Sequence, residues 1–153
     1  MDTIRSITES EWHEAMALAW KVFLRFEADD YNEEGVENFR RFVTDDTLHR
    51  LFLSGHYVVF GYFSRGVMVG MISVRSTNHI SLLFVDENYQ RLGVGSRLIR
   101  YMADYLLEDC GQSEMTVDSS PVAVEFYHKM GFKDTSAEVT ENGIIYTPMV
   151  FYL

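Results

Sequence analysis

The sequence SLLFVDENYQRLGVGSRLIRYM, residues 81–102, contains the transition that decides the fold. An apolar run passes through a polar turn and continues, after Gly93 and Gly95, into a segment whose apolar residues have helical spacing. This order predicts a buried strand that leads into a helix. A helix start leaves backbone N–H groups without partners, and glycine lets an anion approach them closely. The stretch therefore predicts a phosphate-binding turn, with a tight, closely packed turn as the alternative.

Two known phosphate-binding loops are excluded by the same residues. The chain has no GxxxxGK[ST] motif, and GVGSRL lacks the third glycine of GxGxxG. A protein that binds another phosphate-bearing nucleotide remains an alternative at this point.

The flanking segments predict one domain over residues 1–153. Period-two and continuous apolar runs favour strands at 3–7, 57–63, 67–74, 80–85 and 114–118, with a closing pair at 132–139 and 144–153. Helical spacing and start signals favour helices after residue 8, around 36–43, at 45–55, after residue 95 and at 120–131. The three runs between 57 and 85 are separated by hairpin-sized gaps, so we expect them to be antiparallel. The segment 80–118 should be a right-handed crossover between parallel strands.

Composition excludes several classes of protein. The net charge of −10 argues against binding to a nucleic-acid backbone, which requires clustered Lys and Arg, and is compatible with cationic partners. No apolar run approaches the roughly 20 residues of a membrane span, so no membrane association is expected. The first residues have no signal-peptide pattern, which favours a cytoplasmic location. The histidines show no metal-ligand spacing, so no metal is expected, and the one cysteine, Cys110, is expected to be a buried or half-buried filler.

Two motifs together resemble the signature of the GNAT N-acetyltransferase superfamily. QRLGVG (90–95) is similar to the Q/R-x-x-G-x-G/A element of that family, and AVEFYHKMGF (123–132) is similar to its A-x-x-x-Y-x-K-x-G-F element. Their order and spacing also match, and the resemblance covers essentially the whole chain. It implies an α/β (α+β) fold with a single mixed, mostly antiparallel sheet, a splayed parallel strand pair and flanking helices.

The resemblance implies that acetyl-CoA is the cosubstrate and lies between strands 80–85 and 114–118. A backbone N–H near the end of the first strand would polarise the thioester carbonyl. Tyr127 matches the family tyrosine that protonates the departing thiolate, and the alternative is a core tyrosine. Ser120 stands where many members have Asn, so its shorter side chain puts that contact in doubt. The implied cofactor-binding residues are Leu83, Phe84, Val85, Gln90, Arg91, Leu92, Gly93, Val94, Gly95, Ser96, Ser120 and Tyr127.

The amine must lose a proton before it attacks, and the family has no single motif for the base. His79 and Glu87 are candidate bases, His79 because an imidazole titrates near neutral pH. Asp118 is a further carboxylate near the same strand ends. The connection between the first two helices, where the family places its acceptor pocket, offers Phe26, Glu27, Asp30 and Tyr31 as substrate residues. The alternative there is a solvated loop.

The expected function is acetyl transfer from acetyl-CoA to a primary amine by direct attack in a ternary complex. The acidic composition favours a small cationic amine as the acceptor. The alternative is a non-catalytic acyl-CoA sensor on the same fold. The apolar last strand, MVFYL (149–153), could also pair across a homodimer.

Overall fold

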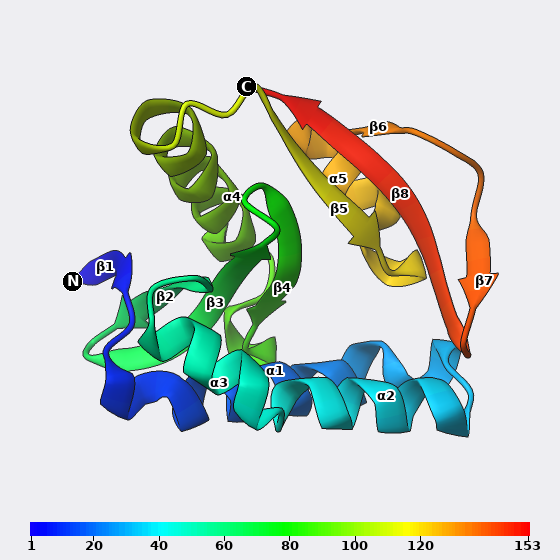
Figure 1. Ribbon diagram of the computed structural model, residues 1–153, viewed down its shortest axis with the longest axis horizontal. Helices are drawn as coiled ribbons and strands as arrows, with labels where there is room; N and C mark the ends of the chain where they lie inside the picture. Colours follow the sequence, from blue (N-terminus) through cyan, green and yellow to red (C-terminus); the bar gives the residue numbers. More distant parts are fainter.

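A computed structural model describes all residues 1–153 (Figure 1). Its sheet has the strand order β1-β2-β3-β4-β5-β8-β6, and β7 pairs with β8. The strands are β1 (Asp2–Ser6), β2 (Val58–Ser64), β3 (Val67–Arg75), β4 (His79–Val85), β5 (Glu114–Ser119), β6 (Lys133–Asp134), β7 (Val139–Glu141) and β8 (Ile144–Tyr152). The helices are α1 (Trp12–Phe26), α2 (Glu33–Val43), α3 (Asp46–Leu53), α4 (Val94–Asp104) and α5 (Val124–Met130). All pairs are antiparallel except β4–β5, which confirms the expected mixed sheet.

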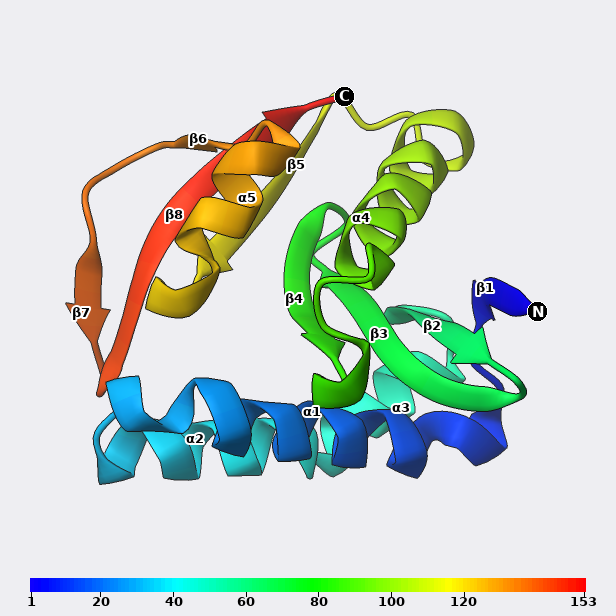
Figure 2. The same cartoon turned by 180° about the vertical axis from the view of Figure 1, so that it is seen from behind.

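The first half of the sheet is buried on both faces. On β3, Met71 joins a core that includes Phe23 of α1, whereas its neighbour Ile72 joins a core that includes Leu98 of α4. Successive strand residues point to opposite faces, so α1 and α4 cover the two sides. Helices α1, α2 and α3 lie side by side along one end of the molecule in both Figure 1 and Figure 2.

Polar side chains start the first three helices. The Glu11 carboxylate accepts a hydrogen bond from the Thr8 N–H at 2.8 Å, as part of a capping box on the 3-10 turn Glu9–Glu11 that leads into α1. Asn32 accepts from Gly35 N–H at 2.9 Å before α2, and Asp45 accepts from Thr47 N–H at 2.6 Å before α3. Each contact satisfies a backbone donor that the helix itself leaves unpaired.

A bulge at Ser81 turns β4 away from β5. Across the β3–β4 pair, Ile80 lies opposite Val74 but Leu82 lies opposite Ser73, so Ser81 has no partner of its own. The Tyr57 hydroxyl supports the bulge by donating to Ser81 Oγ at 3.0 Å, and it also bonds Ser73 Oγ at 2.6 Å. Parallel pairing with β5 is limited to residues 79–80 and 116–117. Beyond them the two strands diverge towards the α1–α2 layer, as Figures 1 and 2 show.

The closing pair of strands differs from the expectation, because its first member is divided into β6 and β7. Pro148 of β8 lies between the two pairing regions, and its carbonyl accepts from Thr135 N–H at 2.9 Å. The N and O atoms of one strand residue point to the same side. The missing N–H of proline therefore faces this segment and interrupts the ladder.

The turn between β7 and β8 packs against the start of α2 (Figure 1). Asn142 and Gly143 both have positive φ, 53° and 78°, as a two-residue hairpin turn with a type I′ backbone requires. The Asn38 side chain donates to Asn142 O at 3.4 Å. A Cβ at Gly35 would lie 2.3 Å from Gly143 O, so the two backbones meet where no side chain fits. This contact joins the C-terminal strands to the helical layer.

Replacing Gly35 with alanine should therefore lower the free energy of unfolding by about 1–3 kcal/mol, the usual cost of overpacking. Alanine favours the helix over glycine by about 1 kcal/mol. A net loss of stability in G35A would therefore mean that the overpacking cost exceeds this gain. Urea unfolding compares G35A with E34A on the same helix. An increase in stability for G35A would show that the β7–β8 turn leaves room for a Cβ at position 35 of α2.

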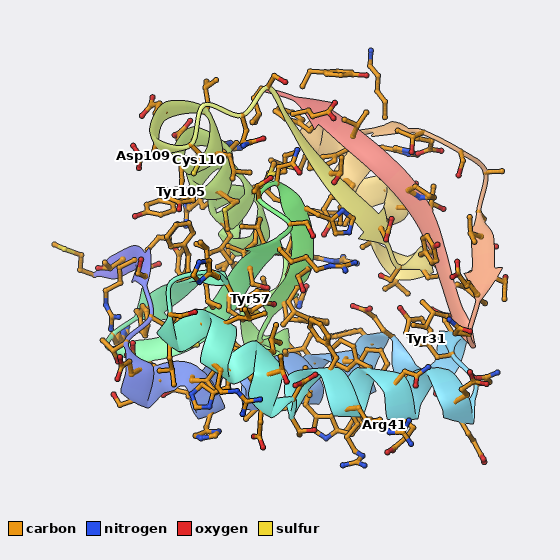
Figure 3. The ribbon with its side chains drawn as sticks, in the orientation of Figure 1. Tyr31, Arg41, Tyr57, Tyr105, Asp109 and Cys110 are labelled. Atoms are coloured by element: carbon orange, nitrogen blue, oxygen red, sulfur yellow. The ribbon has the colours of Figure 1, made fainter.

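Cys110 is exposed and not a core filler as expected. It follows a π-helical turn, Tyr105–Asp109, that ends the α4 segment. Figure 3 shows Tyr105, Asp109 and Cys110 together at the end of this segment, away from the gap between β4 and β5. No helix in the structure is both long and apolar enough to span a membrane.

Candidate active site

A cavity of about 1080 Å³ lies where β4 and β5 separate. The C-terminal end of α1, the end of β4, the start of α4 and one side of α5 line it. The lining residues are Val22, Arg25, Phe26, Glu27, Leu83, Phe84, Val85, Glu87, Tyr89, Gln90, Arg91, Gly93, Val94, Gly95, Ser96, Val122, Ala123, Glu125, Phe126, Tyr127 and Lys129. The cavity therefore combines the predicted phosphate-binding turn with the predicted catalytic tyrosine.

The start of α4 offers backbone donors to this cavity. The first intrahelical hydrogen bond runs from Arg97 N–H to Gly93 O at 3.0 Å. The N–H groups of Val94, Gly95 and Ser96 precede it, and all three residues line the cavity. Unpaired N–H groups and the positive end of the helix dipole together favour a bound anion.

The two glycines of the turn have different roles. Gly93 has φ +83°, a conformation that side chains disfavour, and a Cβ there would meet only Arg97 at 4.0 Å. Gly95 has an ordinary backbone, but a Cβ there would lie 3.2 Å from Phe126 Cζ of α5. Gly93 thus shapes an open turn, whereas Gly95 also permits close packing of α4 against α5, which was the alternative reading of the motif.

Gln90 holds the turn to the end of β4. Its side-chain amide donates to Val85 O at 2.5 Å. That carbonyl consequently accepts a hydrogen bond from a side chain of the protein itself. Along the same edge, residues 81–85 have no partner on β5.

Basic residues from α1, from the turn before α4 and from α5 line the cavity although the chain as a whole is acidic. Arg91, Arg25 and Lys129 all line it. The Arg25 Nε lies 3.0 Å from Glu87 Oε2, and one helical turn earlier the Lys21 Nζ lies 2.7 Å from Asp86 Oδ2. These exposed pairs tie α1 to the segment after β4, at a contribution of about 0–1 kcal/mol each.

Tyr127 is buried by the protein yet lines the cavity. Its ring packs edge-on against Phe126 and Phe132, with centroids 5.2 and 5.1 Å away. The Tyr127 hydroxyl makes no hydrogen bond within the protein, and its oxygen remains accessible to solvent in the cavity. Burial, followed by the negative charge of Glu27, raises the pKa of the phenol. The proton is therefore retained at neutral pH and is available to a group in the cavity.

Comparison with known proteins identifies the family. A family model described as an acetyltransferase (GNAT) domain matches residues 27–153. The chain belongs to the GNAT acetyltransferase family. The YafP protein of Escherichia coli K12, described as an uncharacterized N-acetyltransferase, is 37% identical over 73 residues, which cover 48% of this chain and 44% of that protein. The chain thus matches less than half of the length of this relative.

Solved structures confirm the GNAT fold. A GCN5-related N-acetyltransferase from Rhodopseudomonas palustris has a TM-score of 0.85 and 28% identity, over 100% of this chain and 96% of that one. The PaiA N-acetyltransferase of Thermoplasma acidophilum, solved in complex with coenzyme A, has a TM-score of 0.81 and 18% identity, over 100% and 99% of the two chains.

Glu27 lies at the end of this GNAT cavity nearest the α1–α2 connection. Its half-buried carboxylate lines the cavity with Tyr127. Burial raises the pKa of Glu27 to about 7, the charge of Asp30 adds to the shift, and a hydrogen bond from Ser120 opposes it. Burial, with Glu27 and Asp30 as further causes, also raises the pKa of Tyr31. Figure 3 shows Tyr31 at the α1–α2 connection, near the β7–β8 turn.

The raised pKa of Glu27 predicts an unusual pH dependence of stability. The folded protein holds the Glu27 proton more tightly than the unfolded chain, whose value is near 4.5. The contribution of Glu27 to the free energy of unfolding is therefore fully present below pH 4.5 and is lost as the pH rises through 7. Relative to Glu27→Gln, the wild-type protein should lose about 2–3 kcal/mol between pH 4.5 and pH 8. Urea unfolding of both proteins at the two pH values measures this difference, and equal changes in both would contradict the shift.

The structure brings most of the predicted site residues together. Phe26, Glu27 and Glu87 line the cavity, as do all the predicted cofactor-binding residues except Leu92 and Ser120. Leu92 is exposed, whereas Ser120 is buried. Asp30 and Tyr31 do not line the cavity, although the charge of Asp30 acts on Glu27.

His79 lies outside the cavity lining, on the side of β4 that faces β5. Its Nδ1 bonds Thr116 Oγ1 at 2.7 Å, and its Nε2 lies 3.5 Å from Asp118 Oδ2. The bulge separates it from Ser81, which instead bonds Tyr57. The extra residue in β4 breaks the alternation of side chains between the two faces of the strand.

Several lining residues carried no signal in the sequence. Val22 and Arg25 come from the last turns of α1, and Val122, Glu125 and Phe126 come from the α5 region. Their positions depend on how α1 and α5 pack across the sheet, which no local pattern specifies. For Phe126, the only sequence signal was its position beside Tyr127 on a helix, since adjacent helical residues must point in different directions.

Proposed function

We propose that this GNAT protein transfers the acetyl group of acetyl-CoA to the primary amine of a small cationic molecule, within the cavity between β4 and β5. The observation that carries the proposal is the free hydroxyl of Tyr127 in the same cavity as the unpaired N–H groups of α4. Membership of the acetyltransferase family and the coenzyme A complex of the PaiA structure support it.

The residues present fit a molecule with a pyrophosphate. The N–H groups of Val94, Gly95 and Ser96 would hold the phosphates, and Arg91 and Lys129 would balance their charge. The unpaired edge of β4 at 83–85 would lie along the pantetheine arm. Acetyl-CoA supplies an activated thioester whose acyl carbon accepts the amine.

Tyr127 acts as the general acid in this proposal. A phenol whose pKa is raised stays protonated at neutral pH, and a departing thiolate offers it a strong acceptor. No residue needs to form a covalent intermediate, because the amine attacks the thioester directly. The acceptor end of the cavity contains Glu27, with Asp30 next to it, and the net charge of −10 favours the approach of a cation.

The test is a thiol-release screen of acetyl-CoA against diamines, polyamines, amino acids, aminoglycosides and peptides, together with thermal unfolding in the presence of coenzyme A or ATP. We expect turnover with at least one cationic small molecule and a higher Tm with coenzyme A than with ATP. Stabilisation by coenzyme A with no turnover of any amine would instead support a non-catalytic acyl-CoA sensor. Stabilisation by ATP alone would refute both readings.

A further inference from the structure

The acetyl transfer proposed above needs a group that removes a proton from the incoming ammonium. Four ionisable side chains other than Tyr127 are candidates for this role: His79, Glu87, Glu125 and Glu27. They differ in whether they reach the cavity, in their partners and in their burial.

Three of these groups are poorly placed for the task. His79 is outside the cavity lining and its two ring nitrogens face Thr116 and Asp118 of β5. Glu87 lines the cavity, but its carboxylate is 48% exposed and is engaged by the Arg25 guanidinium at 3.0 Å. Glu125 lines the cavity from the exposed side of α5. Neither carboxylate is enclosed by the protein.

Glu27 combines a place in the cavity with partial burial. It is half-buried, forms no ion pair and lines the cavity with Tyr127. We propose that Glu27 is the general base that accepts the proton of the acceptor ammonium, opposite Tyr127 in the same cavity. This role rests on the proposed function and adds a catalytic residue to it.

The electrostatics of the cavity support this assignment. Asp30 and Tyr31 from the α1–α2 connection and Tyr127 from α5 interact electrostatically with Glu27. The other titratable or charged side chains that line the cavity are Arg25, Glu87, Tyr89, Arg91, Glu125 and Lys129. Burial and Asp30 raise the pKa of Glu27 from 4.5 to about 7. The equilibrium for taking a proton from an amine is thereby improved by about 300-fold over an ordinary glutamate.

Glu27 and Tyr127 also influence each other. The negative charge of Glu27 contributes to the raised pKa of the Tyr127 phenol. When Glu27 takes the proton of the ammonium, this charge disappears and Tyr127 becomes a stronger acid. The general acid is therefore strengthened at the stage when the thiolate leaves.

The proton balance is complete with these two residues. The ammonium gives one proton to Glu27, the C–N bond forms, and the C–S bond breaks with its electron pair on sulfur. Tyr127 gives its proton to that sulfur. The nitrogen then loses its second proton, and of the two protons released, one restores the Tyr127 phenol and the other leaves to solvent.

The experiment compares wild type with Glu27→Gln, Glu27→Asp and Asp29→Asn over pH 5.5–9, with an amine from the screen whose own pKa is above 9. We expect wild-type kcat/KM to rise with an apparent pKa of about 7. E27Q should lower kcat/KM by roughly 10²- to 10³-fold and abolish its rise with pH. E27D should retain part of the rate and the rise with pH. D29N changes the same charge on an exposed residue that does not line the cavity, so its profile should match wild type.

Two further readouts separate a base from a structural or binding residue. The coenzyme A-induced shift in Tm should be the same in E27Q and wild type, and the Glu27 carboxyl carbon should titrate near pH 7 by NMR. A raised KM with unchanged kcat in E27Q, or an unchanged pH profile, would overturn the base role while acetyl transfer stands. If wild type turns over no amine, the proposed function fails, and the role of Glu27 fails with it.

Discussion

Replacing Tyr127 with phenylalanine should lower kcat by roughly 10²- to 10⁴-fold, the usual range for the loss of a positioned general acid. Phenylalanine keeps the ring that packs against Phe126 and Phe132, so the core should be retained. The hydroxyl makes no hydrogen bond within the protein, and its removal leaves no buried partner unsatisfied. The measurement is steady-state thiol release with the best amine from the screen.

The control for this variant is its affinity for coenzyme A. Because we assign the phosphate-binding donors to α4 and not to α5, the Kd of Y127F should stay within about threefold of wild type, less than 1 kcal/mol. A large loss of affinity would show that Tyr127 positions the cosubstrate instead of donating a proton. Nearly wild-type turnover in Y127F would remove it from the mechanism.

Replacing Gly95 with aspartate should weaken coenzyme A binding by roughly 100-fold or more. The new carboxylate would stand at the start of α4, beside the N–H groups assigned to the pyrophosphate. Two like charges about 4 Å apart repel by about 4 kcal/mol in a partly solvated site, and each 1.4 kcal/mol is a tenfold change in Kd. An acidic side chain near a helix N-terminus is itself stabilising, so the fold should tolerate the charge.

Gly95→Ala is the matched control, because it adds the same Cβ near Phe126 without the charge. The Cβ would lie 3.2 Å from Phe126 Cζ, so G95A reports the packing cost alone. Calorimetric titration of both variants at low and high salt separates the two effects, since screening weakens only the charge repulsion. Equal affinities for G95A and G95D would mean that the phosphates bind elsewhere.

Most of the element order could be predicted because its signals are local. Pro121 and Gly131 bracket the last helix region as expected, with Gly131 at φ +106° just after Met130. Apolar runs gave the three antiparallel strands to within one or two residues. The two family motifs likewise directed attention to the turn and the helix that line the cavity.

The features that were not predicted depend on contacts between distant segments. The bulge at Ser81 is defined by its pairing with β3 and by the Tyr57 hydroxyl. The interruption between β6 and β7 follows from the side of β8 on which Pro148 lacks its N–H. Cys110 ends an apolar helical pattern, but the final turn carries it into solvent.

Glu27 shows the same limitation within the site. In the sequence it is one of several acidic residues in a loop between helices, and it was grouped with Asp30 as a candidate ammonium partner. Its raised pKa arises from burial against the α5 region, where Ser120 and Tyr127 lie. A sequence pattern can show that a carboxylate is present, whereas its basicity depends on the tertiary surroundings.

The most direct test of the account is a crystal structure of the protein with coenzyme A. We predict that the pyrophosphate accepts hydrogen bonds from the backbone between residues 91 and 96, and that the pantetheine arm runs beside residues 83–85. The sulfur should then lie next to the Tyr127 hydroxyl. Coenzyme A bound outside the cavity, or a sheet in which β4 and β5 pair along their full length, would contradict it.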